Sequence, residues 1–251
     1  MYNVSDYHNV LAAFVEVQEA MELDHKIGMF INTRKDYIAV GLFYADWSDE
    51  LPRVFDPFSK LTSLIAAVVP TTNGTLVKLM DLLEQWAYRE KDLKHAYLTM
   101  TSRISQELYE ENFEYCKDIL AKLPATVSLH WSIQPLSQAA VEAGEKRGGN
   151  ILGLQKVPQS LWIFACDWKE DVDDDTVHDS LRQCLKGLES MAVERGVKLD
   201  LRFPTFAGAS QDVLGSFGNA SVDKLREVAA KYDPDGFFQE RQCGGFLLRD
   251  L

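Results

Sequence analysis

Two segments of the sequence decide the fold class: residues 26–33, KIGMFINT, and residues 37–45, YIAVGLFYA, separated by Arg34, Lys35 and Asp36. Both segments are rich in β-branched and aromatic residues, which are typical of strands. Because parallel strands need a crossover of a dozen or more residues, a three-residue polar turn permits only antiparallel neighbours. The pair therefore predicts an antiparallel hairpin.

The rest of the chain alternates between strand and helix patterns. We predict further strands at residues 95–103, 127–134, 161–168 and 198–206, and helices at residues 6–21, 61–68, 75–88, 105–123, 136–144, 176–195 and 222–231. No glycine-rich phosphate loop follows any of these strands, which argues against a parallel nucleotide-binding sheet. We expect an α+β fold with a largely antiparallel sheet covered by helices on one face, forming a single domain over residues 1–251.

The composition excludes several classes of partner. The net charge of −12 disfavours nucleic acids and anionic membranes, and no apolar run is long enough to span a bilayer. The first residues lack the basic and apolar regions of a signal peptide, and the four cysteines are scattered without a C-x-x-C pair. The five histidines show no metal-ligand spacing. We therefore expect a cytoplasmic protein with reduced thiols and no bound metal.

Polar residues alternate with apolar ones in the predicted strands. The polar sets are Ser128, His130, Ser132 and Gln134 in one strand, His95, Tyr97, Thr99 and Thr101 in another, and Arg202 with Asp200 in the last. Residues two apart on a strand share a face, so these sets can meet on one side of the sheet. That side is either the solvated face of an ordinary antiparallel sheet or the wall of a ligand cavity.

Three of these polar residues have side chains suited to catalysis. His130 can act as a general acid or base, or donate a hydrogen bond to a carbonyl, although a strand histidine is often merely exposed. Tyr97 can donate its phenol to an oxyanion or simply lie at the sheet edge. Arg202 can hold a carboxylate or enolate, or pair with a neighbouring acid. We expect substrate contacts from His95, Thr99, Ser132, Gln134, Phe203 and Phe206.

The C-terminal stretch, residues 231–239, reads KYDPDGFFQ, and a Gly-Gly-Phe follows at residues 244–246. Asp233-Pro234 ends a helix, Asp235-Gly236 makes a tight turn, and Phe237 and Phe238 are expected to anchor the tail to a core. The stretch resembles the C-terminal signature of berberine-bridge-type FAD-linked oxidoreductases, especially the fungal ones. Residues 52–58, 148–154 and 210–219 resemble further segments of that family, in the family's order.

The resemblance implies a substrate domain over residues 1–206 and the family's C-terminal segment over residues 207–251, without an FAD-binding domain and hence without a cofactor. In the family, the corresponding sheet face lies against the flavin ring and the substrate, which favours a ligand cavity here. One departure is notable. Where the family carries Y-x-N-Y, this chain has Phe203-Pro204-Thr205-Phe206, so two phenol hydroxyls and an amide are missing.

These observations lead us to expect a flavin-independent enzyme of fungal natural-product biosynthesis: a cyclase, pericyclase or isomerase acting on a small apolar metabolite. Three alternatives remain open. The chain can be the substrate-binding half of a split FAD-dependent oxidoreductase, a non-catalytic metabolite-binding protein, or a fragment from a mispredicted or degraded gene. Without an FAD domain, we expect remodelled helices and loops, or a homodimer, to cover the bared surface.

Overall fold

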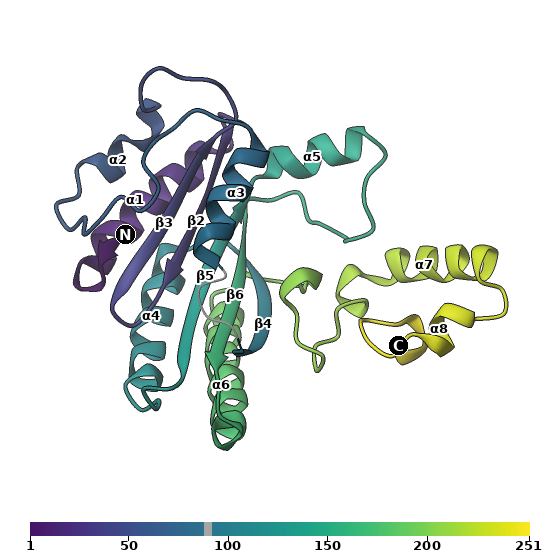
Figure 1. Ribbon diagram of the computed structural model, residues 1–251. Helices are drawn as coiled ribbons and strands as arrows, with labels where there is room; N and C mark the ends of the chain where they lie inside the picture. Colours follow the sequence, from purple (N-terminus) through teal and green to yellow (C-terminus); the bar gives the residue numbers. More distant parts are fainter. Residues whose placement is uncertain (88–91) are drawn as a thin grey trace.

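The structure is a computed structural model that describes residues 1–87 and 92–251. Within these residues the chain forms a seven-stranded sheet in the order β1-β3-β2-β5-β6-β4-β7, with antiparallel neighbours throughout (Figure 1). The strands are β1 (Tyr2–Asn3), β2 (Ile27–Thr33), β3 (Tyr37–Tyr44), β4 (Lys94–Arg103), β5 (Ser128–Leu136), β6 (Gln159–Trp168) and β7 (Lys198–Leu199). The predicted fold class and the β2–β3 hairpin are both confirmed.

Three of the helices described, α1, α4 and α6, cover one face of this sheet. The helices are α1 (Tyr7–Ala20), α2 (Asp56–Ser59), α3 (Leu76–Ala87), α4 (Gln106–Leu120), α5 (Gln138–Lys146), α6 (Asp174–Glu194), α7 (Asn219–Tyr232) and α8 (Phe237–Arg241). Figure 1 shows α4 and α6 behind the strands, and buried side chains of α1, α4 and α6 form one core cluster with the sheet. Within the described residues, no helix is both long and apolar enough to cross a membrane.

Cross-strand register divides the sheet residues between two faces. Trp131 of β5 lies opposite Phe164 of β6, and both are buried in the cluster beneath the helices. The alternate residues, such as His130 opposite Ala165, point the other way because cross-strand neighbours share a face and successive residues do not. We call the side that carries His130 and Ala165 the second face.

A smaller apolar cluster lies where the C-terminal part of the chain meets the Leu161 end of the sheet. Its buried residues are Leu161, Leu201, Val213 and Phe217, with Phe203 and Phe246 packed against them. Gly153, in the loop after α5, packs directly against this cluster. A Cβ at this position would overlap the carbonyl oxygen of Phe217. Beyond the cluster, Figure 1 shows α7, α8 and the C-terminus extending away from the sheet.

Two predicted elements are wrong. Residues 61–68 are not helical, because this segment runs beside β1: Asn3 N donates to Ser63 O at 2.9 Å, and Ile65 N donates to Met1 O at 2.8 Å. The helix forms earlier instead, in α2, where Pro57 sits in the first turn. The predicted strand 198–206 ends at Leu199, and Pro204 begins a short 3₁₀ turn. The predicted end of the third helix, at Tyr88, lies outside the described residues.

The predicted anchoring role of Phe237 and Phe238 is also wrong, since the two side chains are 60% and 63% exposed. Their backbones are what holds the segment. The Asp233 carboxylate accepts the N–H of Phe237 at 2.8 Å and that of Phe238 at 2.9 Å, which caps the start of α8. Gly236 adopts the left-handed conformation that the tight turn requires. The sequence signature therefore encodes a backbone turn, and it leaves two phenyl rings in solvent.

Candidate functional site

Register places most of the predicted site residues in three rows across β5, β6 and β4 on the second face. The rows are Ser128–Asp167–His95, His130–Ala165–Tyr97 and Ser132–Ile163–Thr99, and Gln134 lies opposite Leu161 in the next row. Ala165 therefore has His130 on one side and Tyr97 on the other. Because neighbouring strands are about 4.8 Å apart, His130 and Tyr97 stand about 10 Å apart at their backbones.

His130 is a neutral hydrogen-bond donor in this structure. Its side chain is buried, and Arg34 Nη2 lies 3.3 Å from Nε2. A guanidinium only donates, so Nε2 accepts and the ring proton sits on Nδ1. By distance and angle Nδ1 has no hydrogen-bond partner among the described residues, although the backbone of Ser128 lies close enough to raise the pKa of the ring. Burial and then the Arg34 charge lower the pKa of His130 to about 4, so the ring is uncharged at neutral pH.

Sequence reasoning missed Arg34, which it treated only as part of a polar turn. The Arg34 guanidinium donates to Asn32 Oδ1 at 3.1 Å and to Ser128 Oγ at 3.3 Å, while Asn32 Nδ2 donates to Ser132 Oγ at 2.7 Å. The network ties the end of β2 to the polar residues of β5. The alternation of residues along β2 could have indicated this role. It places Asn32 on the second face, and Arg34 follows two residues later.

Sequence reasoning also did not single out Asp167, which lies in the predicted strand 161–168. Ile163, Ala165 and Asp167 alternate onto the second face, and Asp167 Oδ1 lies 2.7 Å from His95 Nδ1. The Tyr97 ring stacks beside His95, with ring centroids 6.4 Å apart. Burial and the Asp167 charge raise the pKa of Tyr97, so its phenol stays protonated and able to donate.

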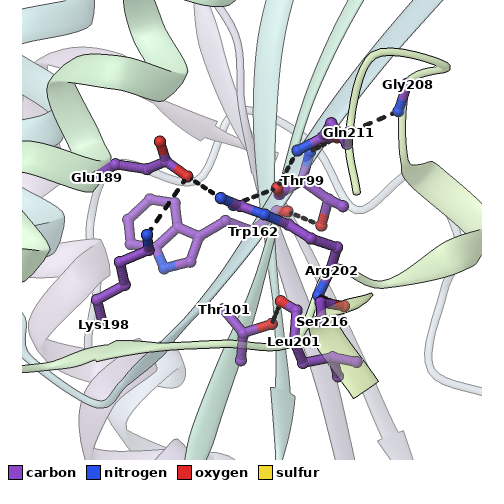
Figure 2. Close-up of polar contacts among 10 residues, drawn as sticks. All are labelled: Thr99, Thr101, Trp162, Glu189, Lys198, Leu201, Arg202, Gly208, Gln211 and Ser216. Carbon is purple, nitrogen blue, oxygen red and sulfur yellow. Dashed lines mark hydrogen bonds and ion pairs between the residues drawn. The ribbon is translucent and has the colours of Figure 1, made fainter. Parts of the chain in front are cut away.

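Thr99 is on the second face, but its polar atoms are already occupied. It is fully buried, and its hydroxyl donates to Trp162 O at 2.6 Å. Gln211 pairs with its backbone, accepting from Thr99 N at 2.9 Å and donating to Thr99 O at 2.7 Å (Figure 2). Thr99 is therefore placed for a structural role. Phe206 lies 6.0 Å from the Tyr97 ring, and Phe203 lies 6.2 Å from Phe206.

Arg202 does not lie on the second face, and that prediction is wrong. Its guanidinium pairs with Glu189 of α6 and donates to Thr99 O at 3.0 Å (Figure 2). Since β7 ends at Leu199, the alternation of a strand does not extend to residue 202. A groove of about 540 Å³ lies beside this ion pair, between α6 and the segment after β7. Arg202 thus closes the edge of β4 and is already neutralised.

The paired glycines of the 148–154 block do not form a phosphate cradle. Gly148 N donates to Glu145 O at 3.0 Å, and Gly149 N donates to Gly144 O at 2.9 Å, so both N–H groups end helix α5. Both glycines have positive φ angles, which suits such a helix end. Within the described residues, no group of acidic, histidine and cysteine side chains is arranged to hold a metal ion.

Comparison with known proteins relates this chain to flavin-dependent enzymes. No protein-family model matches it. An FAD-dependent monooxygenase from Arthrobotrys oligospora is 28% identical over 98% of this chain and 48% of its own length. Another, from Penicillium terrestre, is 24% identical over the whole of this chain and 48% of its own length. The chain therefore spans about half the length of these curated relatives.

Solved structures share the fold at low identity. The 6-hydroxy-D-nicotine oxidase from Arthrobacter nicotinovorans matches with a TM-score of 0.66 at 13% identity, over 95% of this chain and 51% of that one. A variant of BBE-like 1 from Physcomitrella patens matches with a TM-score of 0.64 at 10% identity, over 99% and 52%. The chain is thus a homologue of fungal FAD-dependent monooxygenases along its whole length, with the fold of the matching half of BBE-like FAD-linked oxidases.

Proposed function

We propose that the second face is one wall of a small-molecule site, and that this chain supplies the substrate-facing wall of an FAD-dependent oxidoreductase. The observation that carries the proposal is the buried, unpaired Nδ1–H of His130. Leaving such a donor unpaired costs about 1–3 kcal/mol, which a ligand oxygen would recover. The other unpaired buried donors among the described residues, on Asn112 and Trp131, lie in the core beneath the helices, where a ligand has no access.

The side chains around His130 suggest the chemical class of the ligand. In the register the small residue Ala165 lies between His130 and Tyr97, and Ile163 lies in the next row; both are apolar and only 4% exposed. On β2 and β3 of the same face, Phe30 and Phe43 are 40% and 41% exposed. Neutral donors beside aromatic surface suit a flat, largely apolar molecule with a carbonyl or phenol oxygen.

We expect the second face to contact one side of a flavin ring, and within the described residues we identify no group that would hold the phosphates of FAD. The N–H groups of Gly148 and Gly149 bond to the end of helix α5. A bound flavin would supply electron transfer to or from the substrate. The residues of this chain would bind the substrate, orient its oxygen through His130 and Tyr97, and exclude water with Ile163 and the exposed phenyl rings.

Lumiflavin, which is the flavin ring without phosphates, is a suitable probe for this wall. We expect it to shift the amide resonances of β4, β5 and β6 in the purified chain, and Ala165→Leu to weaken that binding at least tenfold. The matched control is Val193→Leu on α6, where the side chain is 60% exposed on the helix-covered side. Shifts confined to the helices, or equal binding by both variants, would contradict the proposal.

A second candidate is a flavin-independent cyclase, pericyclase or isomerase acting on the same face. It is favoured by Phe203 and Phe206, which present no hydroxyl beside Tyr97, and by two neutral donors that can polarise an enone without any electron carrier. The test is incubation of the chain with polyenes, enones or quinone methides in the absence of cofactor. Product ratios that differ from the spontaneous ones, and that revert in His130→Gln, would support it; unchanged ratios would reject it.

A further inference from the structure

We propose that His95, held by Asp167, accepts a proton from the ligand bound on the second face. The inference rests on the proposed function, since it needs a ligand there. It assigns the acid–base role to a different histidine from the one the sequence favoured: His130 donates, and His95 accepts.

The geometry of the pair supports this role. Asp167 Oδ1 lies 2.7 Å from His95 Nδ1, so the carboxylate accepts the Nδ1 proton and Nε2 is left with a lone pair. The His95 side chain is 49% exposed and that of Asp167 is 21% exposed, which leaves the imidazole accessible while the carboxylate is partly enclosed. A carboxylate behind an imidazole fixes the ring orientation and stabilises the imidazolium once it forms.

His130 lacks the features of a proton acceptor. Its Nε2 is already engaged by Arg34, and its remaining nitrogen carries the proton. The two histidines also lie in adjacent rows on different strands, about 12 Å apart at their backbones from ordinary strand spacing. A ligand of two fused rings spans such a distance between side chains. Its carbonyl would receive the His130 N–H while an acidic O–H at the other end meets His95.

The proton-transfer step is balanced without any further reactant. A phenolic or enolic O–H of the ligand gives its proton to His95 Nε2, and the electron pair of that bond stays on oxygen. The resulting oxyanion is attracted by the imidazolium, which stays hydrogen-bonded to Asp167, and the net charge of the three groups does not change. Tyr97, whose phenol stays protonated, stands next to His95 and can donate to the same oxyanion. His95 later returns the proton to product or water.

The arrangement of His95 can be tested without any ligand. Nitrogen-15 NMR of labelled histidine reports which ring nitrogen carries the proton in the neutral ring. We expect the Nδ1–H form to dominate for His95 in the wild type and the Nε2–H form to gain at least threefold in Asp167→Asn. Dominance of Nε2–H in the wild type, or no response to the substitution, would overturn the proposal.

The proton transfer itself can be followed with 4-nitrophenol, whose phenolate is coloured. We expect the pKa of the bound probe to be about one unit lower in the wild type than in His95→Gln. A shift of this size is typical of an opposite charge nearby. His8→Gln is the matched control, because His8 also faces a carboxylate, Glu110 at 3.6 Å, but lies on α1. Equal ionisation in wild type and His95→Gln, with binding retained, would reject the role of His95. Failure of every variant to bind the probe would instead reject the proposed site.

Discussion

The two faces of the sheet differ in how completely their side chains are covered. On the helix-covered face, Phe164 and Trp162 are fully buried, and the indole N–H of Trp162 donates to Ser102 Oγ at 2.9 Å. On the second face the central residues Ala165 and Ile163 are also buried, but Phe43 and Tyr97 are 41% and 37% exposed. His130 keeps a buried donor without a partner. We infer that side-chain burial on the helix-covered face contributes most of the free energy of unfolding. The second face keeps exposed aromatic rings and an unpaired hydrogen-bond donor that a ligand can contact.

The largest expected effect comes from the same substitution made on each face. Phe164→Ala should lower the free energy of unfolding by about 3–5 kcal/mol, because it opens a cavity beneath the helices. Phe43→Ala should lower it by less than about 1 kcal/mol, since the ring is already partly in water. Urea denaturation of both variants measures the difference. Equal losses would show that the two faces share the folding energy.

A second prediction concerns pH, because His130 has a pKa of about 4 in the folded chain. The ordinary value in an unfolded chain is about 6.5, so the unfolded state binds a proton first as the pH falls. Stability should therefore be intact above pH 6.5 and fall by about 3 kcal/mol as the pH drops towards 4. This loss should be missing in His130→Gln and present in His8→Gln, as measured by urea denaturation at each pH. Parallel pH profiles for the wild type and His130→Gln would refute it.

A third prediction tests how the edge of β4 is closed. Gln211→Ala removes the side chain that bonds to the backbone of Thr99 and accepts from Gly208 N at 3.1 Å. The unpaired backbone groups should lower the free energy of unfolding by about 1–3 kcal/mol. Gln106→Ala, which loses only a bond to Glu110 on α4, should change it by less than about 0.5 kcal/mol. A Gln211 variant as stable as the Gln106 variant would show that the edge is closed by other contacts.

The smallest effect concerns the network on the second face. Arg34→Met removes a positive charge next to His130 and so should raise the pKa of that ring towards its ordinary value. Burial remains, and it is the larger cause, so the pKa should stay below that of an exposed histidine. A proton NMR titration of the imidazole measures the change. An unchanged or lowered pKa would show that Arg34 does not face His130.

Much of the fold followed from local patterns. The three-residue turn at Arg34 dictated antiparallel pairing, and the alternation in residues 127–134 placed Trp131 beneath the helices and His130 on the opposite face. The pattern failed where a neighbouring segment competed. Residues 61–68 have a helical stripe, but backbone hydrogen bonds to β1 hold them extended. The predicted strand 198–206 likewise stops at Leu199, and its last residues form a 3₁₀ turn that begins at Pro204.

The site was less predictable, because its contacts join residues far apart in the sequence. His95 and Asp167 are 72 residues apart, and only the β4–β6 register brings them together. The same holds for Arg34 and His130, which are 96 residues apart. Alternation could indicate that a residue lies on the second face. It could not indicate which histidine is buried against a cation and which one faces a carboxylate.

The central claim is that a flat ligand lies on Ala165, between His130 and Tyr97. Its most direct test is a search for nuclear Overhauser effects between the protons of bound lumiflavin and the methyl groups of the chain. The account predicts a cross-peak to the Ala165 methyl group. Cross-peaks only to methyl groups of the helix-covered side, such as those of Val193, would contradict it.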